Sequence, residues 1–353
     1  MSARATRVAV ALVTAVIMLG TSGAFAAVGD ITTFTDPAGN VSTPLDIAAG
    51  PDGNLWFTNF ANGRIGRITP AGVIRTFTDP EGMVDGPDGI AAGPDGNLWF
   101  TSSRNNRIGR ITTAGVITTF AAPPGGMVDG PLDIAAGPDG NLWFTSGFNN
   151  RIGRITTDGV ITTFDDPAGN VARPFGITAG PDGNIWFTNF RNDFIGRITT
   201  AGVITSFDDP AGNVHATSAI AAGPDGNLWF TSTEPPGRIG RITTDGVITT
   251  FAVPDCNLSC PDGITAGPDG NLWFTSQQND WIGRIATDGV ITTFRDPAGN
   301  VHGPLGITAG PDANMWFTST INDRIGRIAT TGPEPGPPPG PPEPVVVAPR
   351  FTG

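Results

Sequence analysis

A nine-residue stretch, Gly-Pro-Asp-Gly-Asn-Leu-Trp-Phe-Thr at residues 50–58, recurs in near-identical form along most of the chain. The spacing between its seven tryptophans is 43 or 44 residues: Trp56, Trp99, Trp143, Trp186, Trp229, Trp273 and Trp316. A period in the forties is typical of propeller blades and of helical arrays, in which each repeat packs only on its neighbours. The repeat therefore restricts the fold to an array of seven similar units.

Each repeat divides into four short segments separated by turn residues. In the repeat at residues 88–120, the candidate strands are 89–93, 97–102, 107–112 and 116–120. None is long enough, or has the 3.6-residue period, for a helix. The three consecutive apolar residues Leu98-Trp99-Phe100 predict a strand buried on both faces between neighbouring blades. The pattern predicts an all-β, seven-bladed propeller with four antiparallel strands per blade.

Two further expectations concern the inside of a blade. The first segment has the smallest side chains, which favours a place at the crowded axis. The third carries the sequence Arg-Ile-Gly-Arg-Ile, and its glycine is expected to let a neighbouring tryptophan approach closely.

The repeats are offset at the two ends of the chain. No fourth strand follows the last third-strand motif at residues 325–328, whereas a matching segment at residues 31–34 precedes the first full repeat. We expect this N-terminal strand to complete the seventh blade, because a closed ring leaves no edge strand unpaired. An open solenoid would instead need capping repeats.

The segments outside the repeats have other compositions. Residues 1–26 contain two arginines, an apolar run at 8–19 and the sequence Ala24-Phe25-Ala26, the order typical of a secretory signal peptide. Residues 331–353 are proline-rich at their start and predict a disordered tail. The propeller is assigned to residues 27–330, and we expect a secreted or cell-envelope protein without membrane insertion. Cys256 and Cys260, four residues apart, agree with export and allow a small disulfide.

The charge of the chain argues against a nucleic-acid partner. The formal net charge is −12, and the arginines recur evenly with the third strands instead of clustering. A nucleic-acid partner would require concentrated positive charge. We expect a monomer that binds a small molecule or a peptide.

The two predicted faces of the ring differ. The uniform face carries the Pro-Asp-Gly turns between first and second strands and the turns between third and fourth strands. The variable face carries the loops between second and third strands and the crossings between blades, which differ in length and content. Variation confined to one face often marks the binding side of a repeat protein, so we expect the ligand on the variable face.

The aspartates of the Pro-Asp-Gly turns form a ring on the uniform face. We expect each to cap its own turn through its side chain, with a calcium site as the alternative. The last turn has Ala313 in place of glycine, which costs about 1 kcal/mol if this position requires a positive φ.

The sequence Ala-Gly-Pro-Asp-Gly-Asn-Leu-Trp-Phe-Thr, followed by Arg-Ile-Gly-Arg-Ile-Thr, resembles the repeat of the virginiamycin B lyase (streptogramin lyase) family from Asp30 to Thr330. The resemblance implies a seven-bladed propeller and a magnesium-dependent elimination that opens cyclic streptogramin B depsipeptides at an ester bond. It also implies glutamate and histidine at the channel mouth.

The chain departs from that pattern at both positions. Serine or asparagine directly follows Trp-Phe-Thr, where the family often has glutamate. The histidine position is occupied by Leu45, Asp88, Leu132, Phe175, Ser218, Asp262 and Leu305. The favoured hypothesis is therefore a binding module without the family's catalytic residues, and the alternative is a lyase.

A displaced catalytic site is a further hypothesis. His215, Glu234, Asp262 and His302 lie on the variable face in adjacent blades. An imidazole with a carboxylate can supply the base and the acid of an elimination, and the four together can ligate a divalent metal. His215, Glu234 and His302 are the candidate catalytic residues. The alternative is that they are solvated loop residues.

Carboxylates near the inner strands suggest a cation site. Asp88 and Asp262 are the candidate ligands for magnesium or calcium, since both ions prefer carboxylate oxygens. Asp46 and Asp133 also lie near the inner-strand entrances. They come one position later than Asp88, which predicts that they point elsewhere.

Overall fold

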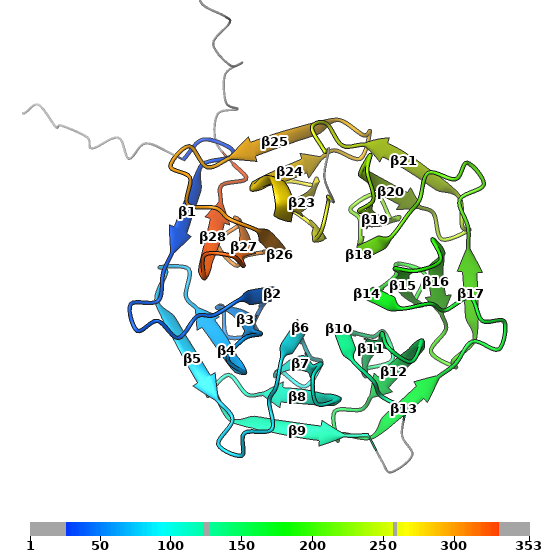
Figure 1. Ribbon diagram of the computed structural model, residues 1–353, viewed down its shortest axis with the longest axis horizontal. Coiled ribbons are helices and arrows are strands. Elements are labelled where there is room, and N and C mark those ends of the chain that lie inside the picture. Colours follow the sequence, from blue (N-terminus) through cyan, green and yellow to red (C-terminus); the bar gives the residue numbers. More distant parts are fainter. Residues whose placement is uncertain (1–25, 123–126, 257–259, 332–353) are drawn as a thin grey trace, which may run out of the picture.

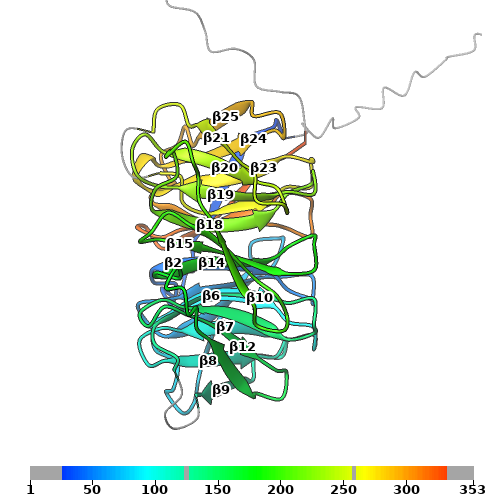
Figure 2. The same ribbon diagram turned by 90° about the vertical axis from the view of Figure 1, so that its right-hand side faces the viewer.

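The computed structural model describes residues 26–122, 127–256 and 260–331. These residues form a closed ring of seven four-stranded antiparallel sheets, with the first strand of each sheet at the axis and the fourth at the rim (Figure 1). Seen edge-on, the ring is a disc with turns and loops on its two faces (Figure 2). The prediction of an all-β, seven-bladed propeller is confirmed. The signal peptide assigned to residues 1–26 and the tail assigned to 331–353 lie, except for one residue each, outside the described residues.

The strands recur with nearly constant length. Blade 1 consists of β2 (Pro44–Ala49), β3 (Leu55–Asn59), β4 (Arg64–Ile68) and β5 (Ile74–Thr78). Blade 2 consists of β6 (Pro87–Ala92), β7 (Leu98–Ser102), β8 (Arg107–Ile111) and β9 (Ile117–Ala121). Blade 3 consists of β10 (Pro131–Ala136), β11 (Leu142–Ser146), β12 (Arg151–Ile155) and β13 (Ile161–Phe164). Blade 4 consists of β14 (Pro174–Ala179), β15 (Ile185–Asn189), β16 (Ile195–Ile198) and β17 (Ile204–Phe207).

The remaining three blades follow the same plan. Blade 5 consists of β18 (Thr217–Ala222), β19 (Leu228–Ser232), β20 (Arg238–Ile242) and β21 (Ile248–Ala252). Blade 6 consists of β22 (Ile264–Ala266), β23 (Leu272–Ser276), the short 3-10 helix η1 (Gln277–Asn279), β24 (Trp281–Ile285) and β25 (Ile291–Arg295). Blade 7 consists of β26 (Pro304–Ala309), β27 (Met315–Ser319), β28 (Arg324–Ile328) and β1 (Ile31–Phe34). Among the described residues, no helix is long and apolar enough to cross a bilayer.

Blade 7 closes the ring as the offset of the repeats predicts. Strand β1 pairs antiparallel with β28, with Ile31 opposite Ile328 and Phe34 opposite Ile325. Phe34 stacks on Trp316 of the same blade at 5.3 Å between ring centroids. The N-terminal strand therefore replaces the fourth strand that the C-terminal end lacks, and β28 is paired on both sides.

The second strand of every blade is buried on both faces. In β3 all five residues are buried, because the strand packs between neighbouring sheets. One core cluster combines Trp56 and Ile65 of blade 1 with Leu98 and Phe100 of blade 2. The described residues contain seven such clusters, most of which join two neighbouring blades. The ring is therefore held together by cores between blades.

The glycine of the third strand has a different neighbour from the one expected. A Cβ on Gly66 would overlap the Phe57 ring of the adjacent strand β3. The expectation of a tryptophan at this position was wrong. The tryptophan instead approaches the glycine before the turn, since a Cβ on Gly50 would lie 2.5 Å from Cδ1 of Trp56.

On the uniform face, one polar cluster repeats in every blade. Asp52 accepts a hydrogen bond from the Trp56 indole nitrogen at 3.0 Å and from the Asn54 side-chain amide at 2.8 Å. Arg67 lies 3.6 Å from the same carboxylate and 5.5 Å from the Trp56 ring. The aspartate-to-indole bond is 2.9–3.0 Å long in all seven blades. The prediction that these aspartates cap their own turns is confirmed.

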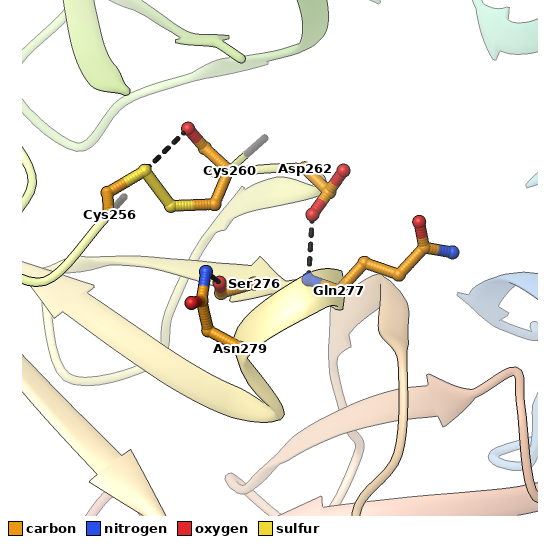
Figure 3. The surroundings of a disulfide bond; sticks show 6 residues. All are labelled: Cys256, Cys260, Asp262, Ser276, Gln277 and Asn279. Carbon is orange, nitrogen blue, oxygen red and sulfur yellow. Dashed lines mark hydrogen bonds between the residues drawn. A yellow bond between two sulfur atoms is a disulfide. The ribbon is translucent and has the colours of Figure 1, made fainter. Parts of the chain in front are cut away.

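Blade 6 begins differently from the others. Its inner strand has three residues, whereas the other inner strands have six. A disulfide joins Cys256 and Cys260, whose Cα atoms are 5.9 Å apart, just before this strand (Figure 3). Both cysteines are buried against Trp281 and Val253 in the core between blades 5 and 6. The disulfide therefore belongs to the packed interior.

Candidate functional site

A cavity of about 350 Å³ opens at the axis of the ring on the variable face. It is lined by the second and third residues of each inner strand, or by their counterparts Asp262 and Gly263 in blade 6, together with Phe190, Thr233 and Gln277 from the loops. All seven blades contribute to the lining. Differences between the blades are consequently brought together in this cavity.

A bulge in the inner strand directs these residues toward the axis. The pairing of β2 with β3 shifts register between Pro44 and Ile47, and the same irregularity occurs in five other blades. Bulges re-aim side chains and are common beside functional sites. Here they place two consecutive residues of each strand, such as Leu45 and Asp46, in the cavity lining.

The threonine of Trp-Phe-Thr fixes the bulge. The Thr58 hydroxyl oxygen accepts a hydrogen bond from the Asp46 backbone N–H at 3.1 Å and donates one to the Asp88 carbonyl at 2.6 Å. It thereby joins the bulge of its own blade to that of the next. The equivalent threonine of blade 7, Thr318, donates to the Leu45 carbonyl at 2.8 Å and completes the circle.

Two of the cavity aspartates hold neighbouring blades together. Asp46 accepts backbone hydrogen bonds from its neighbour Ile47 at 2.8 Å and from Ile90 of the next blade at 2.9 Å. Asp133 makes the same pair of bonds with Ile134 and Ile177. Burial raises the pKa of both carboxyls. The expectation that these two aspartates point elsewhere was wrong, because the bulge brings both consecutive positions to the cavity.

Asp88 and Asp262 occupy the histidine position of the family pattern and line the same cavity. Asp262 accepts a backbone hydrogen bond from Gln277 at 2.7 Å (Figure 3). Burial raises its pKa to about 6. The Asp88 carboxylate has no hydrogen-bond partner among the described residues. Burial and the nearby charge of Asp46 raise its pKa to about 7.

One side of the cavity is apolar and aromatic. The Phe175 ring lies 6.2 Å from the Phe190 ring, at a tilt of 37°. Arg173 lies over the Phe190 ring at 5.0 Å. Leu45, Leu132 and Leu305 supply further apolar lining. Blades 1, 2, 3 and 6 therefore present carboxylates, and blade 4 presents the aromatic wall.

The three candidate catalytic residues lie away from this cavity's lining. Nδ1 of His215 is 3.1 Å from the Asp193 carboxylate, and Nδ1 of His302 is 3.3 Å from that of Asp280. Both imidazoles are 48% exposed. The hydrogen bond that the imidazole donates to the Asp193 carboxylate raises the pKa of His215, and Glu234 contributes through its charge. The structure thus brings His215 and Glu234 near each other, and pairs His302 with a different loop.

These histidine–aspartate pairs accompany a contact that recurs between blades. Asp193 also accepts the backbone N–H of Ala216 at 3.0 Å, and Asp280 accepts that of Gly303 at 2.8 Å. Asn150 makes the same bond to Arg173, without a histidine. The aspartates therefore join adjacent blades whether or not an imidazole is present.

The position after Trp-Phe-Thr has a structural use in this chain. Asn59 is buried and accepts a hydrogen bond from the Ser42 backbone N–H at 3.1 Å. Ser102 is buried and accepts one from Asp85 at 2.9 Å. These side chains bind the backbone of the segments that connect one blade to the next.

The described carboxylates do not form a compact metal site. Within residues 26–122, 127–256 and 260–331, no three His, Cys, Asp or Glu side chains gather closely enough to hold an ion. Asp88 and Asp262 project from blades 2 and 6, on separated parts of the cavity wall. The residues described therefore do not fit the magnesium that the family resemblance implies.

Sequence reasoning missed the aromatic wall and the direction of Asp46 and Asp133. Phe175 stands at the start of an inner strand, where the family resemblance implies a histidine at the channel mouth, and this position could have indicated that its side chain lines the cavity. Phe190 lies in a variable loop, and nothing in the repeat indicates that its ring reaches the axis.

Comparisons with known proteins agree with this architecture. The virginiamycin B lyase family matches at residues 10–219, 87–297 and 170–334. A streptogramin B lyase structure is 33% identical, with a TM-score of 0.77, and the match covers 86% of this chain and 98% of that one. A catalytically inactive histidine-to-alanine variant of virginiamycin B lyase from Staphylococcus aureus, with quinupristin, is 34% identical, with a TM-score of 0.76 and coverage of 85% and 99%.

A more distant structure shares the fold. The extracellular domain of a putative hybrid two-component system from B. thetaiotaomicron is 14% identical, with a TM-score of 0.69, and the match covers 87% of this chain and 44% of that one. A search of curated proteins found no match. The overlapping family matches extend over the whole propeller, and together with the lyase structures they show that the chain belongs to the virginiamycin B lyase family.

Proposed function

We propose that this chain is an exported binding protein that holds a small molecule or part of a peptide in the central cavity of the variable face. The cavity carries this proposal, because a concave, largely apolar site with a few polar groups is the usual form of a ligand pocket. Among the described residues, its lining contains no histidine and no glutamate. A protein that binds a ligand without the family's elimination chemistry would have both a pocket of this form and a lining without those two residue types.

The size of the cavity limits the ligand. Its volume of about 350 Å³ is near the lower end of ordinary ligand pockets, which hold roughly 300–1,000 Å³. A small molecule would enter completely. A cyclic peptide would insert one side group and lie across the variable face.

A lyase is the second candidate function. It is supported by membership of the family and by cavity carboxyls such as Asp88, whose pKa of about 7 suits proton transfer at neutral pH. In that reaction a carboxylate would remove a proton and the ester oxygen would leave. His215, Glu234 and His302 remain the proposed catalytic residues for the same reaction outside the cavity, on the variable face.

The test uses quinupristin, the compound named with the Staphylococcus aureus relative. Calorimetry measures binding, and liquid chromatography measures ring opening with and without magnesium, because elimination leaves the mass unchanged. We expect binding to an intact ring. Ser218→Trp fills the cavity and should abolish binding, whereas Val160→Trp on the uniform face should leave it unchanged.

Two outcomes would overturn the binding proposal. Ring opening by the wild type would establish the lyase instead. Absence of binding, or binding that Ser218→Trp does not alter, would contradict a ligand site in the cavity. Loss of ring opening in a His215→Ala, His302→Ala double variant would assign the chemistry to the rim.

A further inference from the structure

We propose that the central cavity selects an organic cation, with an ammonium group at Asp88 and an apolar body against Phe175 and Phe190. This inference rests on the proposed function, because it concerns the same cavity. It adds the chemical class of the ligand: the carboxylate side of the cavity binds the charge, and the aromatic side binds the apolar body.

Asp88 is the carboxylate that the fold leaves available. The oxygens of Asp46 and Asp133 accept two backbone hydrogen bonds each, and Asp262 accepts one. Asp88 is half-buried and lines the cavity, yet no described donor reaches its carboxylate. A buried ionised group is costly unless it is paired. A cationic ligand supplies the partner that the protein does not.

The surrounding charges favour a cation over a neutral or anionic ligand. Asp46 on β2 and Asp133 on β10 flank Asp88, and the charge of Asp46 acts on Asp88. Asp262 faces the same space from blade 6. In the part of the chain that the structure describes, no arginine or histidine lines the cavity; Arg173 is stacked over Phe190. A cleft lined by one sign of charge concentrates ligands of the opposite sign.

The aromatic wall favours an organic cation over a metal ion. Phe175 and Phe190 line the cavity, and their apolar rings stabilise the organic body of the ligand by shielding it from water. A bare metal ion would leave this apolar surface unused. It would also lack ligands, since the described residues do not gather three candidate ligands in one place.

The test uses benzyltrimethylammonium, which combines a permanent charge with an aromatic body. We expect calorimetry at pH 8 to show binding to the mature chain. The Asp88→Asn variant should bind at least about tenfold more weakly, because a charge-assisted contact is lost. Asp158→Asn is the matched control: it removes the same charge from an exposed turn on the uniform face and should not change the affinity.

A second measurement separates charge recognition from a loss of folding. Benzyl alcohol, a neutral probe with the same benzyl group, should bind equally to the wild type and Asp88→Asn. The affinity of the wild type for benzyltrimethylammonium should rise between pH 6 and pH 8, as the carboxyls of Asp88, Asp46, Asp133 and Asp262 lose their protons, and the rise should be smaller in Asp88→Asn. Since the probe does not titrate, this rise belongs to the protein.

Several outcomes would overturn the inference. These are absence of ammonium binding, equal losses in Asp88→Asn and Asp158→Asn, or displacement of the ammonium by calcium or magnesium at millimolar concentration. Quinupristin binding that is sensitive to Ser218→Trp, without ammonium binding, would reject the inference and leave the proposed function intact.

Discussion

Aspartates on the two faces of the ring show how far the surroundings determine the chemistry of one side chain. On the uniform face, Asp182 accepts hydrogen bonds from Asn184 at 2.7 Å and Trp186 at 3.0 Å, and Arg197 lies 3.7 Å away. Burial opposes ionisation, but the bonds from Asn184 and Trp186 outweigh it and lower the pKa of Asp182. In the cavity, Asp88 has burial without donors, and its pKa rises to about 7.

The difference lies in the supply of donors rather than in sequence context. Both aspartates stand in a Pro-Asp-Gly sequence, Asp88 within β6 and Asp182 in the turn between β14 and β15. Hydrogen bonds to the charged form lower a carboxyl pKa, whereas burial and like charge raise it. An aspartate of the uniform face therefore acts as a permanently ionised cap, and Asp88 remains available for a proton or a ligand.

The largest effect is expected from breaking a cap. Asp182→Ala should lower the free energy of unfolding by about 3 kcal/mol, because the buried Trp186 indole N–H loses its partner and the turn loses its cap. Urea denaturation measures the change. Asp158→Ala, on an exposed turn of the same face, should change it by less than about 0.5 kcal/mol. Equal effects of the two substitutions would show that the caps are not stabilising.

A smaller effect is expected in the cavity, where the ionised carboxylate of Asp88 lowers the free energy of unfolding instead of raising it. Folding raises the Asp88 pKa from 3.8 to about 7, so between these values the folded state binds more protons than the unfolded state. Stability therefore falls as the pH rises through this window. Asp88→Asn should reduce the fall between pH 5 and pH 8 by about 1 kcal/mol, since water in the cavity weakens the effect. Urea denaturation at the two pH values tests this, and an unchanged slope would contradict it.

The uniform face should respond in the other direction. A lowered pKa gives stability that is present above the unfolded value and lost as the pH falls through the folded one. The caps should therefore weaken only in acid below about pH 4, outside the window of Asp88.

The two faces also differ in how much of their structure could be predicted from the sequence. The turn aspartates repeat with the turns that they cap, so their role follows from local chemistry. The partnership with the tryptophan indole was not anticipated, because it depends on the twist of the following strand. The closure of the ring followed from the offset of one strand, which is a property of the whole chain.

The cavity was less predictable because a bulge decides it. An ideal strand sends consecutive residues to opposite faces, which placed Asp46 and Asp133 away from Asp88. The register shift between Pro44 and Ile47 brings both positions to the axis. Likewise, the place of Phe190 depends on the path of a variable loop, which no repeat specifies.

The smallest expected effect sharpens the account of the uniform face by separating backbone strain from hydrogen bonding. Ala313 has a φ of 58°, and its counterpart Gly53 has a φ of 73°. Their turns have the same 3.2 Å backbone bond, and the caps of both blades reach the indole. The alanine therefore keeps the hydrogen bonds and adds only strain, as the sequence predicts.

Ala313→Gly should accordingly raise the free energy of unfolding by about 0.5 kcal/mol. Relief of about 1 kcal/mol of strain is partly offset by the greater freedom of glycine in the unfolded chain. Gly53→Ala is the reciprocal variant, since a Cβ there meets nothing within 4 Å and introduces no clash. It should cost a similar amount, measured by urea denaturation of both variants. A loss in both would mean that blade 7 packs on the Ala313 methyl group, and that its cap differs from the other six.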